Sequence, residues 1–133
     1  MAKYIYPAVF RTEGTRYIVS FPDLEGCCTQ GEDLQDAYDM AEDVLCLMLY
    51  DMEEDGQPVP PATPVMEINP GDDGFVSLVS CDTLEYRQFC DSRPVRRTVT
   101  IPSWLNTMSE RAGLSLSVVL QAALKRELHI ADR

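Results

Sequence analysis

Apolar side chains recur every three or four positions between Leu34 and Glu54, and this spacing predicts one long amphipathic helix. The apolar stripe consists of Leu34, Ala37, Tyr38, Ala41, Val44, Leu45, Met48 and Met52. Asp33 is the expected N-cap, and Asp36 three residues later resembles a shortened capping box. The run Asp55-Gly56-Gln57-Pro58 ends the helix.

Alternating or continuous apolar runs on either side of this helix predict short β-strands. Tyr4–Phe10 and Tyr17–Phe21 flank the turn residues Thr12 to Thr15 and form an expected hairpin. Cys27–Gln30 and Gly74–Val79 are two further expected strands. Between the helix and the last strand, residues 58–70 contain five prolines and are expected to form an extended loop. The order predicted for the first 80 residues is therefore β-β-β-α-β.

A different pattern begins near residue 94. Val95, Val99 and Ile101 share one parity, and Arg96, Thr98 and Thr100 the other, as in a two-faced strand that Pro102 ends. A first helix is expected over Ser103–Arg111, with Gly113 as its stop. Ser115 is the expected N-cap of a second helix with apolar residues at Leu116, Val119, Leu120, Ala123, Leu124 and Leu128.

The strand near residue 98 has no partner within its own segment, so its backbone groups need a second chain. A second copy of this chain would give a two-stranded antiparallel ribbon backed by four helices. Such a ribbon fits the DNA major groove and displays its polar face twice. The expected dimer core consists of Val99, Ile101, Trp104, Leu105, Leu120 and Leu124.

Residues 94–130 resemble the ribbon-helix-helix family of DNA-binding dimers. The resemblance rests on the polar-faced strand, the strand-ending proline and the Gly113-Leu114-Ser115-Leu116-Ser117 turn. It implies base reading by Arg96, Thr98 and Thr100, and phosphate binding by the backbone at Ser115, Leu116 and Ser117. Arg97 departs from the family pattern because it has the inward parity. Either it lies at the ribbon edge and reaches a phosphate, or the register differs there.

The distribution of charge separates the same two regions. The whole chain of 133 residues carries a net charge of −11, which argues against nucleic-acid binding. Residues 93–133, however, hold seven basic and three acidic residues, a net +4, while residues 1–92 hold four basic and nineteen acidic, a net −15. A basic DNA-binding segment next to an acidic domain would suppress non-specific DNA binding. Alternatively, the acidic surface simply aids solubility.

The cysteine and histidine content gives no sign of a metal or disulfide framework. Five cysteines form no CxxC pair, and there is one histidine, His129, so we expect no metal site and no cofactor. No run of 18 apolar residues exists, and the first residues lack the apolar core of a signal peptide. We therefore expect no membrane association and a reducing cytoplasm.

The run from Tyr17 to Leu34, with its F-P-D-L-x-G-C-x-T-x-G core, resembles the HicB antitoxin family over about residues 3–80. That resemblance implies a truncated RNase-H-like domain. The doubled Cys27-Cys28 is a small departure from the family pattern. We expect an α+β protein with a HicB-like toxin-binding domain at 1–80, a linker at 81–93 that is partly helical around residues 83–89, and a ribbon-helix-helix dimerisation domain at 94–133.

The family resemblance implies an antitoxin that binds a small basic ribonuclease toxin of the HicA type and represses its own operon by binding operator DNA. The expected assembly is a homodimer through residues 94–133, and a tetramer through N-terminal contacts stays open. The toxin contacts are expected on the acidic face of the long helix or on the loop Pro22–Gly26. The candidate residues are Asp23, Glu25, Asp36, Asp39 and Asp43.

Two other functions deserve weighing. An RNase-H-like nuclease would need metal-binding acids, for which Asp23, Glu25 and Asp72 or Asp73 are candidates, but these acids lie in turn-like segments. We therefore expect no catalytic residues. A stand-alone repressor could instead sense a small ligand with tyrosines, although aromatic residues at strand spacing usually form core. The tyrosines in question are Tyr4, Tyr6, Tyr17 and Tyr38.

Overall fold

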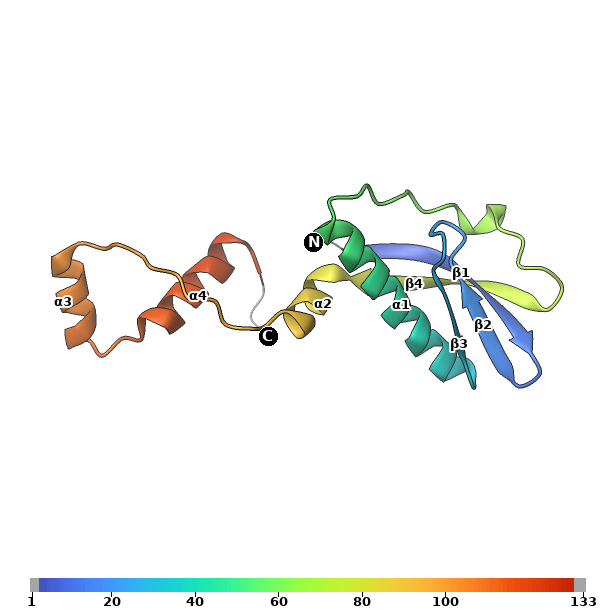
Figure 1. Ribbon diagram of the computed structural model, residues 1–133, viewed down its shortest axis with the longest axis horizontal. Helices are drawn as coiled ribbons and strands as arrows, with labels where there is room; N and C mark the ends of the chain where they lie inside the picture. The colour runs from blue at the N-terminus through green and yellow to red at the C-terminus, as the bar shows by residue number, and fades with distance from the viewer. Residues whose placement is uncertain (1–2, 131–133) are drawn as a thin grey trace. The chain divides into compact units, whose positions relative to one another are not determined.

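The computed structural model describes residues 3–130, and its backbone contacts divide the chain into two units, Met1–Arg93 and Pro94–Arg133. Figure 1 labels the elements, coloured from the N-terminus to the C-terminus. Unit 1 contains β1 (Lys3–Glu13), β2 (Arg16–Ser20), β3 (Cys28–Gly31), α1 (Leu34–Glu54), the short 3-10 helix η1 (Val65–Glu67), β4 (Gly74–Asp82) and α2 (Thr83–Cys90). Unit 2 contains α3 (Ser103–Arg111) and α4 (Leu116–Glu127).

Local sequence signals define both ends of α1, which confirms the predicted helix. The Asp33 carboxylate accepts a hydrogen bond from the Asp36 amide at 2.8 Å, and the Asp36 carboxylate accepts one from the Glu32 amide at 3.0 Å. At the other end Gly56 has a φ of +67°, a backbone conformation that glycine adopts without strain. The chain therefore leaves the helix sharply after Glu54.

The four strands form one antiparallel sheet in the order β3-β2-β1-β4. β1 is the central strand, since it pairs with β4 from Lys3 to Arg11 and with β2 from Val9 to Glu13. Pro7 lies before the point at which β2 joins, so β1 is still a sheet edge on that side. A proline is tolerated in a strand at such an edge.

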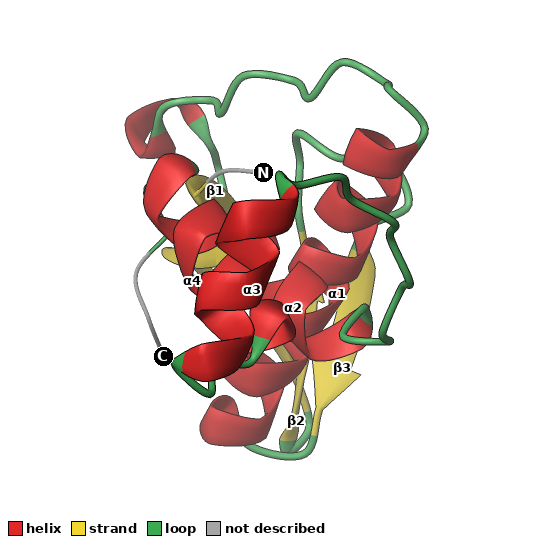
Figure 2. Ribbon diagram, turned by 90° about the vertical axis from the view of Figure 1, so that its left-hand side faces the viewer, coloured by secondary structure: helices red, strands yellow, loops and turns green. Residues whose placement is uncertain are grey.

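One face of the sheet packs against α1 and forms the core of unit 1 (Figure 2). Phe10 and Val19 are cross-strand neighbours on this face, and Leu45 and Leu49 of α1 are completely buried against it. The helix begins very close to β3: a Cβ atom on Gly31 would lie 2.3 Å from the Ala37 amide nitrogen. Glycine is therefore required at the end of the F-P-D-L-x-G-C-x-T-x-G run.

Residues 81–93, the expected linker, include the end of β4 and the whole of α2, which covers the stretch expected to be partly helical. The Asp82 carboxylate caps α2 by accepting from the amides of Leu84 and Glu85. Arg87 then joins α2 to α1: its guanidinium pairs with Glu54 and with Glu53. Long-range contacts, which the sequence pattern does not reveal, therefore attach this helix to unit 1.

Unit 2 has two helices whose bounds agree with the prediction. Ser115 caps α4 by accepting from the Val118 amide, and Gly113 has a φ of +69° in the turn after α3. Residues 94–102 form no strand in the single chain, where no second strand is present. None of the described residues 94–130 is buried.

None of the helices in the described part of the chain combines the length and hydropathy needed to cross a lipid bilayer.

Candidate functional site

A groove in unit 1 lies between the loop that joins β2 to β3 and the C-terminal half of α1. Its cavity volume is about 470 Å³. We call it the acidic groove, and it is lined by Asp23, Leu24, Glu25, Val44, Leu47, Met48, Asp51, Met52, Asp55, Gln57 and Pro60. Its floor is apolar, its rim carries four carboxylates, and no lysine or arginine lines it.

The loop side of the groove is held in a fixed conformation by its own backbone. The Phe21 amide donates to the Cys27 carbonyl at 3.0 Å, and the Leu24 amide donates back to the Phe21 carbonyl at 3.1 Å. The side chains of Phe21, Leu24 and Cys27 are buried. The apolar residues of the F-P-D-L-x-G-C run therefore build the loop, and its acids face outward at the top of the groove.

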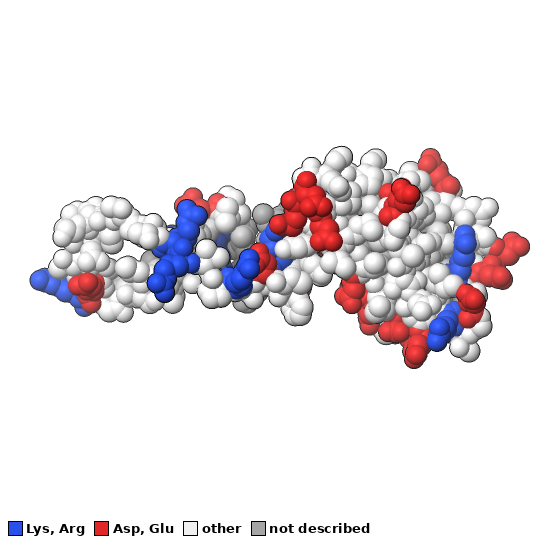
Figure 3. All heavy atoms as spheres, in the orientation of Figure 1, with Lys and Arg blue, Asp and Glu red and all other residues white. Residues whose placement is uncertain are grey.

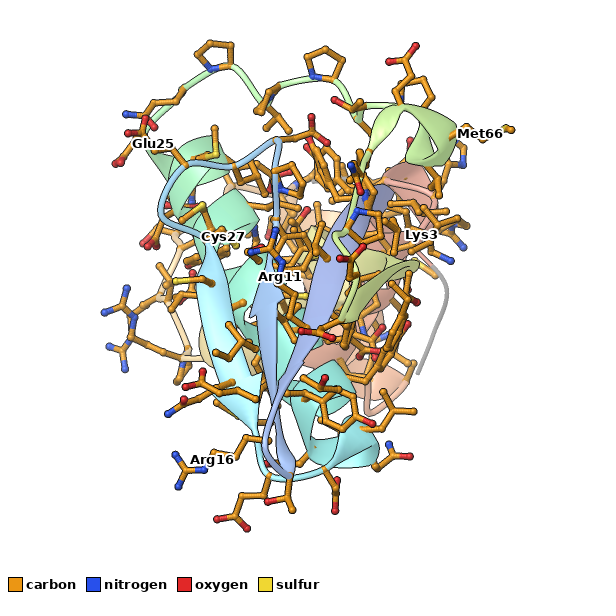
Figure 4. All side chains as sticks on the ribbon, turned by 90° about the vertical axis from the view of Figure 1, so that its right-hand side faces the viewer. Lys3, Arg11, Arg16, Glu25, Cys27 and Met66 are labelled. Carbon is orange, nitrogen blue, oxygen red and sulfur yellow. The ribbon has the colours of Figure 1, made fainter. Side chains whose placement is uncertain are left out.

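The two acids of this loop have different surroundings. Asp23 accepts hydrogen bonds from the Thr63 amide, at 3.0 Å, and from the Thr63 hydroxyl, so its carboxylate fastens the segment after α1 to the loop. Glu25 is exposed. Figure 4 shows it projecting on the opposite side of the view from Met66, and shows Arg16 at the far end of the β1–β2 hairpin. Glu25 is therefore the loop carboxylate that is available to a partner.

The helix side of the groove is one face of α1. Val44, Leu47, Met48, Asp51, Met52 and Asp55 follow one another at steps of three and one, which places them on a single stripe. Leu47 is 48% exposed on this stripe. The apolar residues thus continue outward from the core into the groove and meet the acids at its end.

Of the candidate toxin-binding residues, the structure brings only Asp23 and Glu25 to this groove. Asp36, Asp39 and Asp43 lie on the N-terminal half of α1, where Asp36 caps the helix and Asp39 accepts from the Gln35 side chain at 3.2 Å. Burial and the nearby Asp39 and Asp43 raise the pKa of Glu42 on the same half. Asp51 and Asp55 were not among the candidates, although their four-residue spacing beside Met48 and Met52 was a readable signal.

The tyrosines and aspartates of the two alternative functions, ligand sensing and nuclease activity, lie in the core and in a turn. The four tyrosines that could line a ligand pocket pack in or against the core: Tyr6 is 2% exposed and its hydroxyl donates to the Pro60 carbonyl. Burial and the nearby Asp23 raise the pKa of Tyr6. Asp72 and Asp73 are exposed in the turn before β4. Among residues 3–130, no group of three or more histidine, cysteine, aspartate or glutamate side chains is placed to hold a metal ion.

The candidate DNA-binding residues of unit 2 are all exposed. They are Arg96, Arg97, Thr98 and Thr100 in the segment before α3, and Ser115, Leu116 and Ser117 at the start of α4. The first-turn amides of α4 have no acceptor within the helix, as at any helix N-terminus. The residues expected in a dimer core are exposed as well, from 37% for Ile101 to 65% for Trp104.

Charge divides between the two units. From residue 17 to residue 86 the chain carries seventeen aspartates and glutamates and no lysine or arginine. Figure 3 shows the result on the visible face, where acidic side chains predominate over unit 1 and basic ones over unit 2.

The structure defines a protein with an acidic α+β unit and a basic helical unit. The family described as "HicB_like antitoxin of bacterial toxin-antitoxin system" matches residues 6–116. The chain therefore belongs to the HicB-like antitoxins, a family of toxin–antitoxin regulators and not of enzymes.

Solved structures agree with this family. A toxin–antitoxin complex from Streptococcus pneumoniae is similar over 94% of this chain and 99% of that chain, with 27% identity and a TM-score of 0.61. The Burkholderia pseudomallei antitoxin HicB matches over 95% and 98% of the two chains, with 25% identity and a TM-score of 0.51. The antitoxin HicB3 matches over 97% and 100%, with the same identity and TM-score. The comparison with curated proteins gave no match.

Proposed function

We propose that this chain neutralises a HicA-type ribonuclease toxin with unit 1 and represses its own operon by binding operator DNA with unit 2, in the cytoplasm. The observation that carries the proposal is the division of charge between two structural units, −14 over residues 1–93 and +3 over residues 94–133. One unit is suited to a basic protein and the other to a polyanion.

An acidic unit 1 can neutralise a ribonuclease by competing with its substrate. A toxin that cleaves RNA needs a positive surface for the phosphate backbone, and an acidic protein surface is complementary to the same region. The described part of unit 1 has the α1-on-sheet arrangement that we interpret as a truncated RNase-H-like domain. Solved toxin–antitoxin complexes among its structural relatives support a toxin partner for this chain.

The exposed apolar side chains of unit 2 support a homodimer. Thirteen large apolar side chains between Val95 and Leu128 are at least 37% exposed in the single chain. Exposed apolar side chains in this number, within some forty residues, are typical of a segment that is covered by a partner. In the proposed dimer, Val95, Val99 and Ile101 of two antiparallel strands face the four helices and become buried.

The other face of the same ribbon would read DNA. Arg96, Thr98 and Thr100 would reach base edges in the major groove, with Arg96 best suited to guanine. Arg97 and the first amides of α4 would bind phosphates on either side. The DNA-binding and toxin-binding surfaces would then lie in separate units and be separable by mutation.

The proposal is tested by two assays on one set of full-length variants. Replacing Arg96, Thr98 and Thr100 by alanine should abolish binding to the chain's own promoter DNA and leave inhibition of toxin-catalysed RNA cleavage unchanged. Arg16→Ala, which removes an exposed arginine from unit 1, is the matched control and should change neither assay. Loss of toxin inhibition in the triple variant would show that the two activities do not divide between the units.

A further inference from the structure

We infer that the acidic groove is the surface that receives the toxin, and that a lysine or arginine side chain of the toxin fills it. The inference rests on the proposed antitoxin function and deepens it, since it assigns the contact to one end of α1 and one loop. The aliphatic stem would lie on the apolar floor, and the cationic head would lie among Glu25, Asp51 and Asp55.

The floor of the groove suits a long aliphatic stem. Val44, Leu47, Met48 and Met52 line it from α1 and Leu24 from the loop. Methionine side chains adapt to the shape of what they contact. Lysine and arginine commonly bury their methylene groups along an apolar surface while the charged end reaches a polar rim. A groove of about 470 Å³ that is lined by both apolar and acidic side chains therefore suits a side chain with an aliphatic stem and a charged end.

The acids at the rim are unfavourable for the isolated chain. The C-terminal turn of a helix favours cations, yet the last turn of α1 contains no basic residue and ends beside Asp55. Asp51 and Asp55 are four residues apart, and like charges at this spacing repel. These charges therefore destabilise the C-terminal end of α1, and a bound cation would offset their repulsion.

The neighbouring acids on α1 do have a cation. Glu53 and Glu54 both pair with Arg87 of α2, so unit 1 supplies one positive charge on that side of the helix. Among the described residues no lysine or arginine forms an ion pair with Glu25, Asp51 or Asp55. Near the C-terminal end of α1, the groove carboxylates are thus the ones that can pair with a cation of a partner protein.

Charge complementarity determines the kind of occupant. No lysine or arginine lies between residues 17 and 86, so the segments that line the groove supply no cation of their own. A metal ion is a poor alternative, since no described group of three or more ligating side chains is placed to hold one. A basic protein surface supplies both the cation and the aliphatic stem.

The test compares two double variants of the full-length chain, each of which removes two negative charges from unit 1. Asp51→Asn with Asp55→Asn changes the groove, and Asp72→Asn with Asp73→Asn changes two exposed acids in the turn before β4, which do not line the groove. The probe is the purified HicA-type toxin from the reading frame next to this gene, and the dissociation constant is measured by titration calorimetry. We expect the groove variant to weaken binding by about 10- to 100-fold and the control by less than about threefold.

A second variant addresses the apolar floor. Leu47→Ala shortens an exposed side chain and should weaken toxin binding by about 3- to 10-fold while the thermal transition of the chain stays unchanged. Equal weakening by the two Asp→Asn pairs would mean that only overall charge matters, and would overturn the groove assignment while leaving the antitoxin function standing. Absence of toxin binding by the unmodified chain would overturn the proposed function itself.

Discussion

Trp104 gives the sharpest test of the proposed dimer. It lies in the first turn of α3 and is 65% exposed in the single chain. A tryptophan buries about 150–250 Å² when fully enclosed, so the dimer would remove about 100–160 Å² of Trp104 from water in each subunit. At about 25 cal/mol per Å², this area contributes roughly 2.5–4 kcal/mol per subunit. Trp104→Ala should therefore raise the dimer dissociation constant by at least about a thousandfold.

The assay is sedimentation equilibrium over a concentration series, with Phe89→Ala as the matched control. Phe89 is an exposed aromatic residue in α2 of unit 1, so removing it should leave the dimer unchanged. A Trp104→Ala chain that dissociates no more readily than the unmodified chain would refute the reasoning. It would mean that Trp104 is not buried in an interface between two copies of this chain.

Three further outcomes are expected. Arg96→Ala should cost about 1–3 kcal/mol of operator binding at fixed salt and relax specificity at one base pair per half-site, and an unchanged affinity in a gel-shift titration would show that the strand register is wrong. Leu49→Ala, at a fully buried core position, should lower the free energy of unfolding by about 2–5 kcal/mol in a urea titration, and a loss below about 1 kcal/mol would contradict the packing described. The hydrogen bond to Glu53 raises the pKa of Tyr4 to about 12, so its contribution to stability should be complete below pH 10 and be lost as the pH rises through 12. The difference in tyrosinate absorbance between the unmodified chain and Tyr4→Phe measures this, and ionisation of Tyr4 near pH 10 would count against the bond.

The parts of the fold that depend on neighbouring residues could be predicted from the sequence. The bounds of α1 follow from Asp33, the apolar stripe and Gly56, all of which act within one or two helical turns. The bounds of α3 and α4 follow in the same way from Gly113 and Ser115. Pairing of β1 with β4 joins residues about 70 apart, and no local pattern specifies such a partner.

The helix α2 shows where local signals were insufficient. It is eight residues long, and a helix this short is marginal without packing. Its packing comes from Arg87 with Glu53 and Glu54, and from Tyr86 against Tyr50 with ring centroids 5.4 Å apart. These contacts span more than thirty residues, so the sequence indicated a helical stretch in a linker but not its attachment to α1.

The sequence allowed only the loop side of the acidic groove to be predicted. Asp23 and Glu25 lie in a turn-like segment, which made them candidates in the sequence. Asp51 and Asp55 line the same groove only because α1 ends beside that loop. Asp36 lies outside the groove, and its carboxylate caps the start of α1, as the capping-box pattern predicted. Tertiary placement, and not the number of acids, separates the two groups.

The measurement that tests the central claim most directly is inhibition of the toxin itself. The purified HicA-type toxin from the neighbouring reading frame would be incubated with an RNA substrate and increasing amounts of the full-length chain. The account predicts that RNA cleavage falls to zero near a stoichiometric ratio of the two proteins, and that promoter DNA is bound by the same preparation. Undiminished RNA cleavage in the presence of excess, folded chain would contradict it.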